Sequence, residues 1–127
     1  MFDHEKLKVY QLSLSFTGWA STLLERVPRK ISVCDHLDAA STSIVLNIAE
    51  GNGRYTSKDR CRFFDIARGS ALECAASLDI LVNKHIFGVD EILAGKRMLY
   101  EIVSMLIGLI KSNSERVHEP VVGYNSD

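Results

Sequence analysis

The chain has 127 residues, of which 46% are hydrophobic and 24% charged, and its formal net charge is −1. This length fits one domain with a single hydrophobic core, and the composition excludes the disordered and collagen-like classes. Because the molecule as a whole has almost no net charge, any surface that binds nucleic acid must be a local patch.

Apolar residues recur at alternating spacings of three and four along four segments of the chain. This spacing places them on one face of an α-helix, so it predicts four amphipathic helices that share a core. The first predicted helix stops before Pro28, because the residue that precedes a proline is driven out of helical geometry. The four predicted helices span about residues 4–27, 31–50, 57–84 and 90–113.

Two glycines, Gly51 and Gly53, follow the second predicted helix. Glycine after a periodic run commonly ends a helix in left-handed geometry, which predicts a tight loop over residues 51–56. Thr56 and Asp59 have the spacing of a capping box, so we expect the third helix to begin there.

The third predicted helix breaks at Gly88, and the fourth ends near Asn113. Residues 114–127 have no helical period and are expected to form a flexible C-terminal tail. Since the predicted connections are only a few residues long, consecutive helices should pack antiparallel. The sequence therefore predicts an all-α, up-down-up-down four-helix bundle that forms a single domain over residues 1–113.

The fourth predicted helix has more apolar surface than one helix seam requires. Met98, Val103, Ile107 and Ile110 lie beside the row that is expected to face the core. A helix that is apolar over much of its circumference is buried on more than one side. In so small a domain, the second apolar side of this helix is most simply buried by another subunit, which predicts a homo-oligomer. An unusually wide core within one chain is the alternative.

The chain shows no signal for export. Residues 1–10 are rich in charged side chains and lack the apolar run of a secretory signal. The most apolar stretch, residues 98–110, is shorter than the ~20 residues that a membrane-spanning helix needs. Cys34, Cys61 and Cys74 have no CxxC or zinc-binding spacing, which is typical of core thiols in a reducing compartment. We therefore expect a cytoplasmic protein without a metal centre or a cofactor.

No pattern in the sequence matches a catalytic motif. The segment Gly51-Asn52-Gly53 lacks the continuation of a phosphate-binding glycine motif, and no predicted strand precedes it. The four histidines are scattered and form no helical pair. Neighbouring positions on a helix point in different directions, so the thiol of Cys34 and the imidazole of His36 would not face each other. We therefore expect a protein that binds and does not catalyse.

A polar cluster of Ser43, Asn47 and Glu50 occupies one side of the second predicted helix, because spacings of four and three return to the same face. Arg68 on the third predicted helix can reach Glu50, and such a pair more often fixes helix register than performs chemistry. Gly69 costs about 1 kcal/mol within a helix relative to alanine. We expect close packing against the small residues of the second helix to compensate for it.

Basic residues cluster between positions 54 and 68, where five positive charges face only two negative ones and give a local charge of +3. Tyr55 and Phe63 or Phe64 are interleaved with them, and aromatic rings beside guanidinium groups suit stacked bases and phosphates. An ordinary solvated helix face with core phenylalanines is the alternative. A ring of subunits would repeat the patch and multiply weak phosphate contacts. The candidate RNA-binding residues are Arg54, Lys58, Arg60, Arg62 and Arg68.

The central third of the chain, residues 40–73, contains the elements LNIAEG and FxxIARGSxxE. These elements closely resemble the hallmark of the bacterial four helix bundle protein family, also called 23S rRNA intervening-sequence proteins. The resemblance extends more loosely over residues 2–113. Arg62 and Arg68 match the family pattern within the basic patch. The other matching positions, which we expect to be structural, are Asn47, Glu50, Gly51, Phe63, Gly69, Ser70 and Glu73.

The resemblance implies a four-helix bundle and a ring-shaped homo-oligomer, commonly a pentamer. It also implies a link to RNA, because some members of the family are encoded within inserts of the large ribosomal RNA. A related branch is similar to the accessory variability proteins of diversity-generating retroelements, in which a basic pentameric barrel binds reverse transcriptase and nucleic acid.

The leading hypothesis is a non-enzymatic, ring-forming bundle that contacts RNA or a ribonucleoprotein through its basic patch. The alternative is a protein-interaction scaffold, for example an accessory subunit that binds a reverse transcriptase without contacting RNA. In that alternative the basic stretch serves solubility or subunit contacts. Neither hypothesis involves a membrane or a small-molecule substrate.

Overall fold

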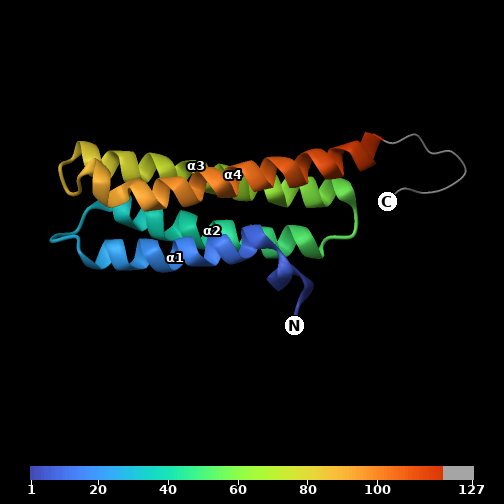
Figure 1. The fold of residues 1–127 in the computed structure, drawn as a ribbon, viewed down its shortest axis with the longest axis horizontal. Helices are drawn as coiled ribbons and strands as arrows, with labels where there is room; N and C mark the ends of the chain where they lie inside the picture. The colour runs from blue at the N-terminus through green and yellow to red at the C-terminus, as the bar shows by residue number, and fades with distance from the viewer. Residues whose placement is uncertain (119–127) are drawn as a thin grey trace, which may run out of the picture.

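Four long α-helices make up most of the chain in the computed structural model, which describes residues 1–118 and the side chains of residues 1–115 (Figure 1). No strand occurs within this part of the chain, so the predicted all-α class is confirmed. The helices are α1 (Lys8–Glu25), α2 (Ser32–Gly53), α3 (Ser57–Asn83) and α4 (Val89–His118), and a short 3-10 helix, η1 (Asp3–Lys6), precedes them.

The four helices lie side by side along one long axis (Figure 1). α2 packs against both α1 and α3, and α4 packs against both α3 and α1. At one end of the bundle, Arg26 forms an ion pair with Glu91 in the first turn of α4. At the other end, Arg60 near the start of α3 donates a hydrogen bond to Asn113 near the end of α4. At each end of the bundle, a side-chain contact between residues that are distant in sequence therefore holds two elements together.

The end of α2 differs from the predicted loop over residues 51–56, because the helix continues through Gly53. Gly51 is buried, and a Cβ atom at this position would lie only 2.9 Å from Cε1 of Phe64. The glycine is thus required for the close approach of α3 and not for left-handed geometry. The chain leaves the helix at Arg54, whose backbone is extended, with φ −75° and ψ 148°.

Two other boundaries differ from their predicted positions. The first predicted helix, 4–27, is divided into η1 and α1 by the extended backbone of Leu7, with φ −73° and ψ 129°. α4 continues past residue 113 to His118, so the first part of the predicted tail is helical. The remainder of that tail, residues 119–127, lies outside the described residues.

The turns at the ends of α3 are defined by hydrogen bonds. The Thr56 side chain caps the helix by accepting from the backbone amide of Asp59, as the sequence predicts. At the other end, His85 adopts left-handed geometry with a φ of 62°. Its amide donates to Val82 and the amide of Ile86 donates to Leu81, which together form a Schellman motif. The helix therefore ends at Asn83, one residue before the predicted end at residue 84 and five residues before Gly88.

The core is built from the inward faces of all four helices. Burial, followed by the charge of Glu73, raises the pKa of the Cys74 thiol to about 12, so this thiol stays protonated at neutral pH. Cys34 and Cys61 are only half-buried, unlike the core thiols that the sequence predicts. The largest fully buried apolar side chains are Phe16, Phe64, Leu37, Ile44, Ile48, Leu78, Leu81, Leu99, Ile102 and Leu106.

The extra apolar surface of α4 is partly covered within the chain. Met98, Val103 and Ile110 are half-buried and pack against the core, whereas 39% of Ile107 is exposed. Packing within one chain therefore covers much of the extra apolar surface of α4, and the homo-oligomer stays a prediction. None of the helices within residues 1–118 has the length and apolar character needed to cross a membrane.

Gly69 occupies an open position on α3, and a Cβ atom there would meet nothing within 4 Å, so the predicted close packing against α2 is wrong. Because glycine within a helix costs about 1 kcal/mol relative to alanine, we expect Gly69→Ala to raise the free energy of unfolding by about this amount in a urea titration. Gly95→Ala is the matched control. Its Cβ would lie 2.2 Å from Cζ3 of Trp19, and we expect a loss of roughly 1–3 kcal/mol. A less stable Gly69→Ala protein would contradict this assignment.

Candidate nucleic-acid interface

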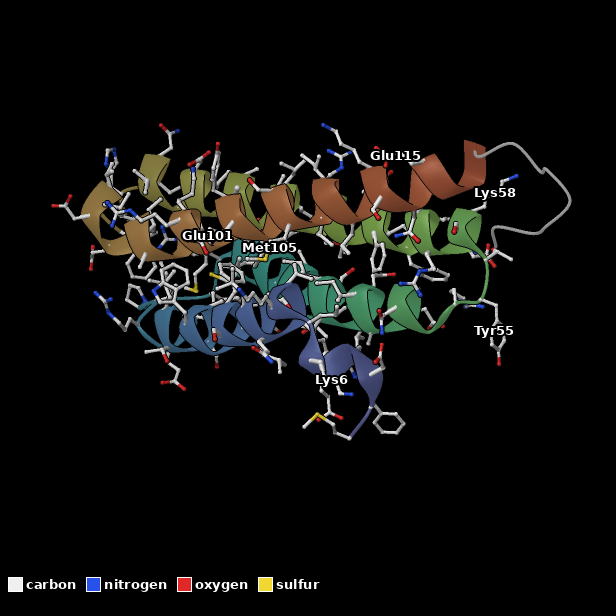
Figure 2. All side chains as sticks on the ribbon, turned by 45° about the vertical axis from the view of Figure 1, so that its right-hand side comes forward. Lys6, Tyr55, Lys58, Glu101, Met105 and Glu115 are labelled. Atoms are coloured by element: carbon white, nitrogen blue, oxygen red, sulfur yellow. The ribbon has the colours of Figure 1, made fainter. Side chains whose placement is uncertain are left out.

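The structure brings three of the five predicted cations together at the junction of α2 and α3. Arg54 directly follows α2, and Lys58 and Arg62 lie one turn apart on the exposed side of α3. Figure 2 shows Lys58 and the neighbouring Tyr55 projecting away from the bundle at this end. We call the three cations Arg54, Lys58 and Arg62 the cationic edge.

The ring of Phe63 organises two of these cations. The guanidinium groups of Arg54 and Arg62 both lie over this ring, with each Cζ atom 4.5 Å from its centroid. Each arginine also has an acidic neighbour: Arg54 Nη2 is 2.9 Å from a Glu50 oxygen, and Arg62 Nη2 is 3.8 Å from an Asp59 oxygen. Cation–π contacts of this kind hold guanidinium groups in place while part of each group stays in water.

Lys58 and Arg62 are the cations most available to a ligand. Lys58 is exposed and forms no hydrogen bond or ion pair with the described residues. The Arg62 side chain is 59% exposed, and its only acidic contact among the described side chains is the long one to Asp59. Arg54 is more constrained, because its Nε atom is covered without a hydrogen-bond partner in the described part of the chain.

Arg60 points into the structure and not toward a ligand. Its Nε atom donates to the side chain of Asn113 at 3.1 Å, and its Nη1 atom donates to the backbone oxygen of Asn52 at 2.9 Å. The guanidinium therefore joins the end of α2, the start of α3 and the end of α4. No local pattern could have indicated this role, because Asn113 lies 53 residues further along the chain.

We expect Arg60→Ala to lower the free energy of unfolding by about 2 kcal/mol, because hydrogen bonds that involve a charged group each contribute about 1.5–3 kcal/mol. Thermal or urea denaturation measures this loss. Arg62→Ala is the matched control, since Arg62 is exposed on the same helix, and its stability should change by less than about 0.5 kcal/mol. Equal stability of the two variants would show that the Arg60 contacts do not support the fold.

Arg68 lies apart from the cationic edge. Its Nε and Nη2 atoms contact the same oxygen of Asp65, at 3.0 and 2.9 Å. The predicted pair between Arg68 and Glu50 is wrong, because Glu50 pairs with Arg54 on its own side of the helix junction. The positive charge of Arg68 is thus largely matched by a neighbour one turn away.

A family model and a solved structure match this chain. A family model described as "23S rRNA-intervening sequence protein" matches residues 5–108. The chain belongs to this family. A crystal structure from Bacteroides thetaiotaomicron, of a protein with unknown function from the S23 ribosomal protein family, has the same fold, with a TM-score of 0.77. The two chains are 23% identical, and the match covers 81% of this chain and 98% of the other. No curated protein matches the chain.

In this member of the 23S rRNA-intervening sequence protein family, pattern residues form a polar link between α2 and α3. The hydroxyl groups of Ser43 and Ser70 are 2.8 Å apart. Asn47 Nδ2 donates to the backbone oxygen of Ser43 at 2.8 Å and to its hydroxyl at 3.0 Å. Glu73 lies 3.7 Å from His36 of α2. The sequence placed Ser43 and Asn47 on one face and Ser70 on the third predicted helix opposite them, but it did not predict the contact between the two hydroxyl groups.

Proposed function

We propose that this protein is a non-enzymatic subunit of a ring-shaped homo-oligomer, most simply a pentamer, that binds RNA or a ribonucleoprotein in the cytoplasm. Each subunit is an up-down-up-down bundle whose cationic edge contacts the RNA. One observation supports this proposal above the others: two guanidinium groups are held on Phe63, and the exposed Lys58 lies beside one of them, Arg62.

The chemistry of the cationic edge suits a phosphate backbone. Guanidinium groups donate bidentate hydrogen bonds to phosphate oxygens, and a lysine adds a mobile point charge. Asp59 and Asp65 reduce the positive potential of one subunit, so a single edge should bind weakly. A ring presents the edge several times on one particle, and linked weak contacts produce a much higher combined affinity.

A salt series tests this proposal. Filter binding of the oligomer to a structured RNA should show a linear fall of log affinity with log salt concentration. If one subunit neutralises three phosphates, its contribution to the slope is about −2 to −3. Absence of binding at low salt, or an affinity independent of salt, would contradict the proposal. Native mass spectrometry of the same sample measures the number of subunits.

A protein-interaction scaffold is the second candidate function, and an apolar hollow between α3 and α4 favours it. The hollow is lined mainly by Leu72, Ala75, Leu99, Tyr100 and Val103. Exposed apolar surface of this kind commonly marks a protein contact. An accessory subunit that binds a reverse transcriptase through such a surface would not need the cationic edge. Charge reversal at that edge therefore distinguishes the two functions.

A further inference from the structure

We propose that Tyr55 and the hollow beside it bind one unpaired base, so that the protein binds single-stranded RNA more tightly than duplex. This inference rests on the proposed function and specifies its ligand. Three aromatic rings lie near the cationic edge, and the structure distinguishes among them. Phe64 is fully buried, and Phe63 already contacts two guanidinium groups. Tyr55 is 100% exposed, so its ring is the one that can accept a base.

The hollow beside Tyr55 has the character of a base site. It is lined by Leu46, Ala49, Glu50 and Gly53 from α2, together with Arg54 and Tyr55 from the loop that follows. Leu46 is 62% exposed although it is a large apolar residue, so its side chain offers a second apolar wall. The volume of about 500 Å³ lies within the roughly 300–1,000 Å³ range of small-molecule sites.

The position of the hollow connects base binding with phosphate binding. Arg54 lines the hollow and also belongs to the cationic edge. Tyr55 lies in the loop three residues before Lys58, and Figure 2 shows the two side chains at the same end of the bundle, with Lys58 on the side of α4 and Tyr55 on the opposite side. Arg54 shares the Phe63 ring with Arg62, so a strand whose backbone passes Arg62 and Arg54 can place a base against Tyr55.

The exposed ring favours single-stranded RNA on physical grounds. Within a duplex both faces of each base are already stacked, whereas an unpaired base can leave its neighbours and stack on an aromatic side chain. Such stacking tolerates any sequence, because every base has a flat aromatic face. The apolar walls and the single ring of Tyr55 match this mode of binding.

The test uses short single-stranded RNA that contains 2-aminopurine, whose fluorescence falls when it stacks, with a duplex of equal length for comparison. We expect Tyr55→Leu to weaken single-strand binding roughly tenfold and to remove the fluorescence change. Duplex binding and the salt slope should not change, because the cationic edge is intact. Tyr55→Phe keeps the ring and should bind within about twofold of the original protein, given that stacking requires only the aromatic face.

The possible outcomes separate this inference from the proposed function. If Tyr55→Leu binds single strands as tightly as the original protein while charge reversal at the edge abolishes binding, the base site is wrong and RNA binding stands. If the original protein binds neither RNA, the proposed function fails together with the base site. Equal losses for single strands and duplex would overturn the base site as well. Because Tyr55 is fully exposed, an unchanged melting temperature should accompany each substitution.

Discussion

Simultaneous charge reversal of Lys58 and Arg62 to glutamate is expected to lower the affinity for RNA about 100-fold. Each substitution removes a phosphate contact and places a negative charge where the RNA backbone approaches, and the ring repeats both changes in every subunit. At low salt the loss is largest, because phosphate binding depends on the release of counterions. Filter binding or fluorescence anisotropy at fixed salt measures the change.

A matched variant controls for the change in total charge. Lys30 and Lys84 are exposed lysines outside the cationic edge, and reversing both changes the net charge by the same amount. We expect that variant to retain most of its RNA affinity. Size-exclusion chromatography with light scattering then shows whether each variant keeps the same number of subunits. Loss of the oligomer in the Lys58 and Arg62 variant would assign the edge to subunit contacts and would favour the scaffold.

Phe64→Ala is expected to destabilise the fold by about 3–5 kcal/mol, the range measured when a fully buried phenylalanine is truncated. Phe64 is completely buried, and Gly51 of α2 lies against its ring. The Arg60 guanidinium is 5.9 Å from the centroid of the same ring, so the substitution also weakens the hydrogen-bonded contact that Arg60 makes with α4. Urea denaturation followed by circular dichroism measures the loss.

The neighbouring Phe63 provides the comparison for this prediction. Phe63 is half-buried and contacts two arginines at the surface, so Phe63→Ala should cost much less stability than Phe64→Ala. It should instead weaken RNA binding, because the guanidinium groups lose the ring that positions them. Equal destabilisation by the two substitutions would contradict the assignment of Phe64 to the core and Phe63 to the interface.

Helical periodicity was sufficient to predict four helices and most of their core residues. It could not predict where α2 ends, because a glycine can serve either left-handed geometry or the close approach of another helix. Gly51 and Gly69 illustrate the difference: Gly51 lies against Phe64, whereas Gly69 is open. Which of the two roles a glycine has depends on whether another helix packs against it, and a local sequence pattern does not contain that information.

The basic patch was predicted as a set of residues, but the availability of each charge could not be predicted. Arg60 and Arg62 are two residues apart in sequence, yet Arg60 bonds to Asn113 inside the fold and Arg62 is exposed. A count of charges treats them alike. Hydrogen-bond partners reduce the five predicted cations to the three of the cationic edge.

Ultraviolet cross-linking of the intact oligomer to single-stranded RNA, followed by mass spectrometry of the cross-linked peptides, tests the central claim most directly. We expect cross-links to concentrate in the peptides that contain Tyr55 and Phe63, with further contacts at Lys58. The control is the variant with Lys58 and Arg62 reversed, which should lose these cross-links. Cross-links confined to α1 or to the outer face of α4, or their absence at low salt, would contradict RNA binding by the cationic edge.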